Sequence, residues 1–225
     1  MELKNKTIII TGGTKGLGLA MATGFKNEGA NVVVCSRNEE EFKNAPDGVL
    51  SVKADVTKEE ELENVLNIAK DKFGSVDIWV NNAGIWLPHR PIEETDWRRA
   101  HDLIEVNLFG TVYGSKVALT EMKKENSGLI INVLSTSALE GKVNETAYCS
   151  SKFAADGFTE SLRKELETTQ IKVFSVYPGG MMTNLFDEEI PEKYSEYMDP
   201  NFVAEKIISN LKSDSPEEEL VIRRN

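Results

Sequence analysis

Short stretches rich in Val and Ile alternate with helical patterns along most of this 225-residue chain. Apolar runs of this length are typical of buried strands, and apolar residues three or four apart are typical of helices that pack on them. Their alternation predicts a parallel sheet with right-handed crossovers and helices on both faces. We therefore expect an α/β fold, a Rossmann-like doubly wound sheet of about seven strands, in a single domain over residues 1–225. The predicted strands are residues 6–11, 31–36, 49–53, 76–80, 128–134, 171–177 and 219–222.

Charge and cysteine content narrow the function classes. The 37 acidic and 26 basic side chains give a net charge of -11, which argues against nucleic acid as a partner. Cys35 and Cys149 match neither a metal-ligand spacing nor a disulfide framework, so we expect no metal site and a reducing compartment. No signal-peptide pattern opens the sequence and no apolar run approaches ~18 residues, so a cytoplasmic location without a membrane span is expected.

Three runs of consecutive glutamates, at residues 39–41, 59–61 and 217–219, invite comparison with metal or acid/base clusters. Consecutive residues do not converge on one point in a helix. We interpret these runs as solvated faces or turns.

Four glycines lie within seven residues directly after the first predicted strand, at Gly12, Gly13, Gly16 and Gly18. A helix pattern follows them. A helix N-terminus presents unpaired amide groups and the positive end of a dipole, and glycines let a bulky anion approach the backbone. This order of strand, glycine turn and helix predicts a binding site for a pyrophosphate, although the glycine spacing is not G-x-G-x-x-G. The alternative is a plain tight turn, for which one glycine would suffice.

Arg37 follows the second predicted strand, about 20 residues after the glycine turn. In dinucleotide-binding folds this position meets the adenosine ribose, where an acid selects a free 2′-hydroxyl and an arginine accepts a 2′-phosphate. The alternative is an exposed loop arginine. After the third strand, Asp55 is a candidate helix cap or adenine contact, and Thr57 with Glu60 is a candidate capping box for a helix that reaches Phe73.

Tyr148 and Lys152 lie four residues apart at the start of a predicted helix and therefore share one face. That face continues as an apolar stripe, which places Lys152 where a charge is costly. The cation would favour the phenolate and lower the Tyr148 pKa from ~10 by up to about three, making Tyr148 a proton donor or acceptor near neutral pH. The alternative is a surface helix with a snorkelling lysine. Asn107, on another helical stripe, needs a buried partner and is a candidate organiser of water or backbone.

The motifs, taken in order, resemble those of a known family. They are Thr11-Gly12-x-x-x-Gly16-x-Gly18, Asp55-Val56, Asn81-Asn82-Ala83-Gly84, Asn107, Ser135, Tyr148-x-x-x-Lys152 and Pro178-Gly179. Over about residues 6–185 the chain resembles the short-chain dehydrogenase/reductase family. The resemblance implies that Tyr148 is the general acid/base, that Lys152 lowers its pKa and binds the nicotinamide ribose, and that Ser135 hydrogen-bonds the substrate oxygen. It also implies that Asn107 holds the water of a proton relay. Ser137 competes with Ser135 for the serine role, and the family spacing of thirteen residues before Tyr148 selects Ser135.

Strand ends and the resemblance together give one set of expected cofactor contacts. These are Gly12, Thr14, Lys15, Gly16, Leu17, Gly18, Ser36, Arg37, Asp55, Val56, Asn82, Ala83, Gly84, Tyr148, Lys152, Pro178, Gly179 and Thr183. Lys15 and Arg37 place two positive charges near the expected adenosine end, where the resemblance associates a basic residue with NADP(H). We therefore expect NADP(H) to be preferred over NAD(H).

The expected activity is hydride transfer between NADP(H) and a small carbonyl or alcohol substrate, as a carbonyl reductase or, in reverse, an alcohol dehydrogenase. The alternative is a non-catalytic nucleotide-binding sensor or scaffold on the same fold. A sensor has no need of a proton relay, so the presence of Asn107, Ser135, Tyr148 and Lys152 together argues against it. A hydrolase is not expected, because the chain has no Gly-x-Ser-x-Gly motif.

Residues 181–199 mix apolar, aromatic and acidic side chains without a clear period and are predicted to form a substrate flap. We expect His89 to edge the substrate pocket and His101 to lie on a helix surface. Expected substrate contacts are Trp86, Leu139, Met181 and Phe186, with Leu87, Met182, Tyr194 and Tyr197 as further members. These side chains suggest an apolar or aromatic carbonyl compound.

Two departures from the family pattern concern substrate and assembly. Leu134 stands where many relatives have another serine, and the sequence ends soon after Val221-Ile222 without the glycine-rich segment common there. Family tetramers often pair through that segment, so a tetramer is not expected. A homodimer through the helices around residues 97–124 stays open.

Overall fold

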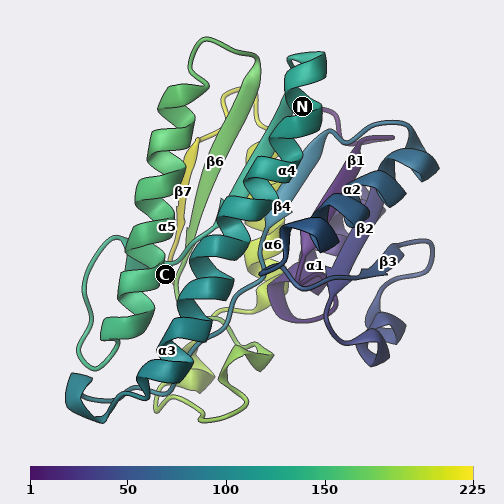
Figure 1. Cartoon of the computed structure of the whole chain (residues 1–225). Coiled ribbons are helices and arrows are strands. Elements are labelled where there is room, and N and C mark those ends of the chain that lie inside the picture. Colours follow the sequence, from purple (N-terminus) through teal and green to yellow (C-terminus); the bar gives the residue numbers. More distant parts are fainter. Residues whose placement is uncertain (225) are drawn as a thin grey trace.

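The computed structural model describes residues 1–224, in which seven strands form one parallel sheet. The sheet order is β3-β2-β1-β4-β5-β6-β7, so the chain winds outward from β1 in both directions (Figure 1). This confirms the predicted fold class. The strands are β1 (Thr7–Thr11), β2 (Asn31–Ser36), β3 (Leu50–Lys53), β4 (Ile78–Asn81), β5 (Gly128–Val133), β6 (Ile171–Pro178) and β7 (Glu219–Ile222). Strand β4 begins two residues later than predicted, and the other strand ends agree within one residue.

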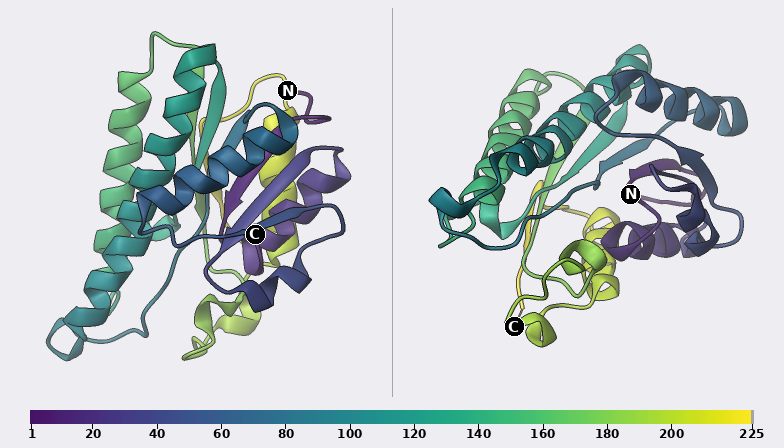
Figure 2. Two further views of the ribbon diagram at one scale, coloured as in Figure 1. Left: turned by 45° about the vertical axis from the view of Figure 1, so that its right-hand side comes forward. Right: turned by 60° about the horizontal axis from the view of Figure 1, so that its bottom comes forward.

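Helices cover both faces of the sheet. They are α1 (Gly16–Asn27), α2 (Glu59–Phe73), α3 (Trp97–Ile104), α4 (Gly110–Glu125), α5 (Thr146–Glu165) and α6 (Pro200–Lys212). Helices α1 and α6 pack on one face and α2, α4 and α5 on the other, as the right-hand view of Figure 2 shows. Segments between elements form short 3-10 turns at Glu39–Asn44, Ile92–Glu94, Thr136–Ala138, Asn184–Phe186 and Tyr194–Glu196.

The apolar core has two layers, one on each side of the sheet. Strand β1 is buried along its whole length, and its side chains alternate between the layers. Ile8 and Ile10 pack with Phe25 of α1, whereas Ile9 packs with the layer under α2, α4 and α5. Burying a side chain of this size contributes about 1.5–3 kcal/mol, so the register of β1 is strongly fixed. The carboxyl end of β1, where the glycine turn starts, is therefore held in place.

A buried polar network joins β4 to β5 and to the helices above them. Asn81 Oδ1 accepts a hydrogen bond from Trp79 Nε1 (2.8 Å), and Asn81 Nδ2 donates to Asn132 Oδ1 (2.8 Å). Asn132 Nδ2 in turn donates to Thr159 Oγ1 of α5 (2.9 Å). Each amide is satisfied, which is the condition for burying one without a large cost. Asn81 is therefore a structural residue, although it belongs to the motif at the end of β4.

The start of α2 differs from the predicted capping box of Thr57 and Glu60. The helix begins at Glu59, and the side chain of its N-cap residue, Lys58, makes no capping hydrogen bond. Instead Asp55 Oδ1 accepts from the backbone N (3.0 Å) and hydroxyl (2.9 Å) of Thr57, and Glu61 Oε2 accepts from Asp55 N (2.7 Å). The predicted box was wrong because Asp55, two residues earlier, engages the Thr57 hydroxyl that the box requires.

Candidate active site

A cavity of about 680 Å³ opens at the carboxyl ends of the strands, bounded by the segment after β4 and by residues 181–198. Both segments lie at the lower end of the sheet in Figure 1. Every predicted cofactor contact except Asp55 lines this cavity, as do Ser135, Trp86, Met181 and Phe186. Asp55 is instead engaged at the start of α2. The sequence motifs thus converge on one place.

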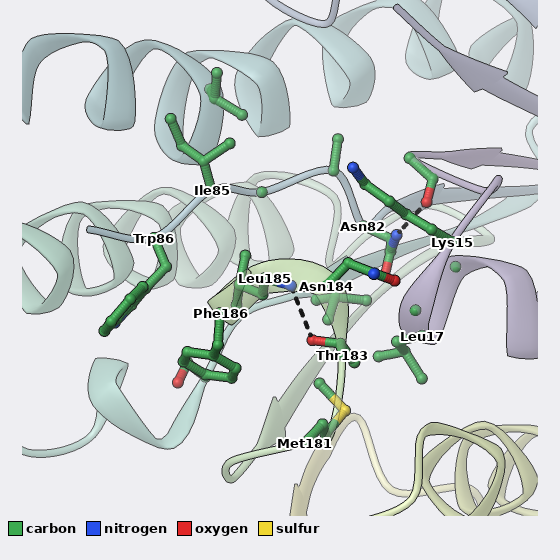
Figure 3. A pocket seen from close by; sticks show the side chains of 18 of the residues that line it. Lys15, Leu17, Asn82, Ile85, Trp86, Met181, Thr183, Asn184, Leu185 and Phe186 are labelled. Atoms are coloured by element: carbon green, nitrogen blue, oxygen red, sulfur yellow. Dashed lines mark hydrogen bonds between the residues drawn. The ribbon is translucent and has the colours of Figure 1, made fainter. Parts of the chain in front are cut away.

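The glycine turn brings the N-terminus of α1 to the cavity wall. Gly12 has a φ of +62°, which strains any other residue, and a Cβ at Gly18 would overlap the carbonyl oxygen of Gly12. Asn82 Nδ2 fixes the turn by donating to Thr11 O (2.9 Å) and Gly12 O (3.2 Å) (Figure 3). The N-cap residue of α1 is Lys15, and its side chain makes no hydrogen bond to the backbone amides of the first turn. The first residues of α1, Gly16 to Gly18, line the cavity, so their backbone amide groups are available there to an anion.

Glu41, which belongs to a run interpreted from the sequence as a solvated face or a turn, lines the cavity beside the glycine turn. Its Oε2 accepts from Thr14 Oγ1 (2.7 Å) and Ser36 Oγ (3.1 Å), and its Oε1 lies 3.3 Å from Lys15 Nζ. Burial favours the neutral acid, but these hydrogen bonds and the lysine charge outweigh it, so the pKa of Glu41 lies below its usual value. The run does lie in a turn, at residues 39–44, but this turn folds the Glu41 carboxylate back onto the ends of β1 and β2, so Glu41 is not a solvated side chain.

Arg37 also lines the cavity, next to Ser36, and its side chain is exposed. Within residues 1–224 no carboxylate lies within ion-pair distance of it, in contrast to Lys15. The two predicted cations of this region therefore differ: one is paired with Glu41 and the other is open to a ligand.

Helix α5 places Tyr148 and Lys152 on the cavity wall, as the four-residue spacing predicted. Lys152 is 5% exposed, and its Nζ lies 5.9 Å from the Tyr148 ring centroid and donates to Val133 O (3.2 Å). Burial lowers the pKa of Lys152 to about 8. The ammonium therefore loses its proton far more easily than an exposed lysine does.

The Tyr148 pKa is shifted in the opposite direction to the prediction. Burial raises the pKa of the phenol, and interaction with the Ser135 hydroxyl offsets only part of that rise, while the charge of Glu145 adds to it. Both groups are withdrawn from water and each favours its neutral form, so the pKa of Tyr148 is raised and that of Lys152 is lowered. The prediction of a lowered Tyr148 pKa is wrong for the protein by itself. Tyr148 remains protonated at neutral pH and can donate a proton.

The structure separates the two candidate serines. Ser135 follows β5 and lies beside the Tyr148 phenol, and its Oγ accepts from Ser137 N (3.1 Å). Ser137 Oγ points the other way and donates to Glu145 Oε2 (3.4 Å). Of the two, Ser135 has the geometry to act together with Tyr148.

Asn107 lies in a π-helical turn (Glu105–Phe109) between α3 and α4 and is buried behind the cavity wall. Its Oδ1 accepts from Ile85 N (2.9 Å), and its Nδ2 donates to Ile85 O (3.0 Å) and Ser151 Oγ (3.1 Å). The predicted buried partner is thus the backbone of the segment after β4. These contacts engage both polar atoms of the Asn107 side chain within the protein. A role of Asn107 in a proton relay stays a prediction.

Aromatic rings form the far end of the cavity. Trp86 and Phe186 meet edge to face with centroids 5.0 Å apart (Figure 3). The Phe186 ring also contacts that of Tyr197, with centroids 5.5 Å apart. Leu139, predicted as a substrate contact, does not line the cavity and is 42% exposed. The 3-10 turn at Thr136–Ala138 carries the chain away from the cavity before Leu139 is reached.

A carboxylate that the sequence did not single out lies among these side chains. Glu145 Oε1 is 3.1 Å from His89 Nε2, and both residues line the cavity, as was expected of His89. His101 lies exposed on α3, also as expected. The substrate end is therefore less apolar than predicted. A signal existed in the position of Glu145 at the start of the same helix as Tyr148.

Residues 181–198 are joined to the rest of the chain in two different ways. At the base, Met181 and Met198 form a bridge, and Met198 is buried in the core layer of α1 and α6. At the tip, Arg99 Nη1 donates to Glu188 Oε1 (2.8 Å) and Arg90 Nη2 to Glu189 Oε2 (2.7 Å), with all four side chains about half exposed. The base is thus anchored by burial and the tip by solvated ion pairs.

Across residues 1–224, no group of three or more His, Cys, Asp or Glu side chains is arranged to hold a metal ion. None of the described helices combines the length and apolar character that a bilayer-spanning helix requires.

Comparison with known proteins gives consistent matches over nearly the whole chain. A family model described as short chain dehydrogenase matches residues 6–193. An uncharacterised oxidoreductase of Staphylococcus aureus (strain MRSA252) is 35% identical over 218 residues, covering 93% of this chain and 92% of the relative. An alcohol dehydrogenase from the archaeon Thermococcus sibiricus, complexed with 5-hydroxy-NADP, superposes with a TM-score of 0.88 at 27% identity, covering 98% of both chains. A 3-ketoacyl-(acyl-carrier-protein) reductase from Brucella melitensis, complexed with NADH, gives a TM-score of 0.89 at 28% identity, covering 98% of this chain and 97% of the other.

Proposed function

The chain belongs to the short-chain dehydrogenase/reductase family of oxidoreductases, and from that premise we propose that it transfers hydride between NADP(H) and a small carbonyl or alcohol compound. The observation that carries the proposal is the convergence of Ser135, Tyr148, Lys152 and the glycine turn on one cavity.

The chemistry assigned to the side chains follows from what carbonyl reduction needs. Hydride addition to a carbonyl carbon leaves an alkoxide, which must be stabilised and then protonated. Ser135 and Tyr148 lie together and can both donate to that oxygen. Because burial keeps the Tyr148 phenol protonated at neutral pH, it is suited to deliver the proton.

The residues around the glycine turn fit a nicotinamide dinucleotide, which would supply the hydride when bound. The lack of side chains at Gly12 and Gly18 lets the turn pack closely against Asn82, and the first residues of α1, which no side chain caps, line the cavity. We assign the pyrophosphate to this turn and the nicotinamide ribose to Lys152. Asn82, Ala83 and Gly84 then form the wall between the two.

Preference for NADP(H) is proposed from Arg37. Its guanidinium is open at the end of β2 and can fork two N–H groups to a 2′-phosphate. The solved relatives named above contain 5-hydroxy-NADP in one case and NADH in the other, so the preference has to be argued from this chain's own residues.

The test combines a substrate panel with a tyrosine variant. Purified protein is mixed with NADPH and a series of ketones, aldehydes and quinones, and cofactor absorbance is followed. With an active substrate, Tyr148→Phe should lower kcat by about 10² to 10⁴, because no phenolic proton can be given to the alkoxide. NADPH affinity, measured by fluorescence titration, should stay close to wild type.

Tyr113→Phe is the matched control, since it removes a phenol from α4 outside the cavity. It should leave kcat unchanged. A Tyr148→Phe variant with half the wild-type kcat would refute the role of Tyr148. NADPH binding without turnover of any carbonyl would favour the sensor alternative.

A further inference from the structure

The adenosine end of the cavity contains an anion of the protein's own. The Glu41 carboxylate accepts hydrogen bonds from Thr14 Oγ1 (2.7 Å) and Ser36 Oγ (3.1 Å) and pairs with Lys15 Nζ at 3.3 Å. Two hydroxyls and an ammonium thus converge on one acceptor. Thr14 is 1% exposed and Ser36 is partly buried, so the two hydroxyls belong to a built site, whereas the Lys15 side chain is 55% exposed and reaches the carboxylate from the surface.

The donors that hold Glu41 are of the kinds that commonly hold a phosphate. Hydroxyls and an ammonium bind phosphate oxygens through charge-assisted hydrogen bonds, as they do carboxylate oxygens. They come from the glycine turn and from the end of β2, where the fold places the adenosine ribose. Arg37, the residue after Ser36, borders the same space.

From this geometry we infer that Glu41 is a specificity-determining residue: its carboxylate competes with the 2′-phosphate of NADP(H) for Thr14, Lys15 and Ser36. The inference rests on the proposed use of a nicotinamide dinucleotide. It adds that Arg37 alone does not set the cofactor preference.

The competition weakens NADPH binding selectively. A 2′-phosphate carries close to two negative charges, so it must either displace Glu41 from its donors or lie beside a like charge. The 2′-hydroxyl of NADH has no such conflict, because it can donate a hydrogen bond to the same carboxylate. Glu41 therefore reduces the preference for NADPH over NADH that Arg37 creates.

The decisive variant is Glu41→Gln, which keeps the side-chain shape and removes the charge. We expect the dissociation constant for NADPH to fall by about tenfold, the size of effect typical of one charge-assisted hydrogen bond. Affinity for NADH should stay equal or weaken. The ratio of the affinity for NADPH to the affinity for NADH should thus rise by about tenfold or more.

Glu40→Gln is the matched control, because it changes the net charge equally at the adjacent, exposed position, whose side chain makes none of these contacts. Its affinity ratio should equal that of wild type. Thermal unfolding of both variants checks that they remain folded.

A second measurement isolates the adenosine end from the nicotinamide end. Calorimetric binding of adenosine 2′,5′-bisphosphate and of adenosine 5′-monophosphate is compared in wild type and Glu41→Gln. Only the bisphosphate should bind more tightly to the variant, again by about tenfold.

The outcomes separate this inference from the proposed function. If wild type binds dinucleotides but Glu41→Gln leaves the ratio unchanged, moves it toward NADH or behaves like Glu40→Gln, the inference is overturned and hydride transfer stands. If wild type binds neither NADPH nor NADH, both fall.

Discussion

The two halves of the cavity are built by different kinds of contact. In the cofactor half, Thr11 Oγ1 accepts from the backbone N of Asn82 and of Ala83 (both 3.0 Å), so the ends of β1 and β4 are joined through a buried hydroxyl. In the substrate half, the tip of residues 181–198 is held by Arg99–Glu188 and Arg90–Glu189, which are half exposed.

This difference has an energetic consequence. Breaking a buried hydrogen bond leaves an unsatisfied polar group and costs about 1–3 kcal/mol, whereas an exposed ion pair contributes about 0–1 kcal/mol. We therefore expect the cofactor half to behave as one unit with the core and the tip of residues 181–198 to open independently. Three experiments test this contrast, in decreasing order of expected effect.

The largest effect is expected from the buried charge of Lys152. Below pH 8 the ammonium is protonated in the folded and the unfolded chain, so the full cost of its burial is present. Between about 8 and the ordinary value of 10.5 the unfolded chain binds more protons, and the free energy of unfolding rises with pH. The interval corresponds to about 3 kcal/mol. Lys152→Met should therefore be more stable than wild type by up to about this amount at pH 7, and the gap should close toward pH 10.5.

Urea denaturation at a series of pH values, on protein without added cofactor, measures this gap. Lys164→Met is the control, because Lys164 is exposed on the same helix and paired with Glu160. Its difference from wild type should be nearly constant between pH 7 and pH 9. A constant gap for Lys152→Met would mean that Lys152 is hydrated in the folded protein.

A middle-sized effect is expected from the close packing of the glycine turn. Gly18→Ala places a methyl group against the Gly12 carbonyl oxygen, and overpacking of this kind costs about 1–3 kcal/mol. Gly157→Ala, in helix α5, meets no atom within 4 Å and should stabilise the protein by about 0.5–1 kcal/mol through helix propensity. The two variants should thus move the urea midpoint in opposite directions. Equal shifts would show that the turn is not tightly packed.

The smallest change in stability is expected at the substrate half. Arg99→Ala removes an exposed pair and should change the free energy of unfolding by less than about 1 kcal/mol. Hydrogen exchange of backbone amides in residues 184–197 should nevertheless accelerate, because this segment loses one of the three ion pairs that join it to the rest of the described chain. Wild type in 1 M salt should show a similar change, since exposed pairs are screened.

Arg98→Ala is the control for this experiment, as Arg98 lies exposed on the same helix away from Glu188. It should leave exchange in residues 184–197 unchanged. Equal exchange in Arg99→Ala and wild type would indicate that the aromatic contacts of Phe186, and not the ion pairs, hold the tip closed.

The amino-acid sequence by itself determined the fold and the location of the cofactor half. Strand and helix periods are local, so they predicted the order of elements, and the turn between β1 and α1 was evident from Gly12, Gly16 and Gly18. Because parallel strands all end at one edge, residues after successive strands had to meet there. The four-residue spacing of Tyr148 and Lys152 was sufficient to place both on one helix face.

Only the tertiary structure decided how those side chains are charged and what else reaches them. The direction of the Tyr148 pKa depends on withdrawal from water, which sequence spacing does not encode. Glu41 reaches Thr14 through a contact across 27 positions in the sequence, and Arg99 reaches Glu188 across 89. Leu139 was misplaced because one 3-10 turn redirects the chain. Distances through space and exposure to water arise only when the elements pack, and these quantities set the chemistry of the cavity.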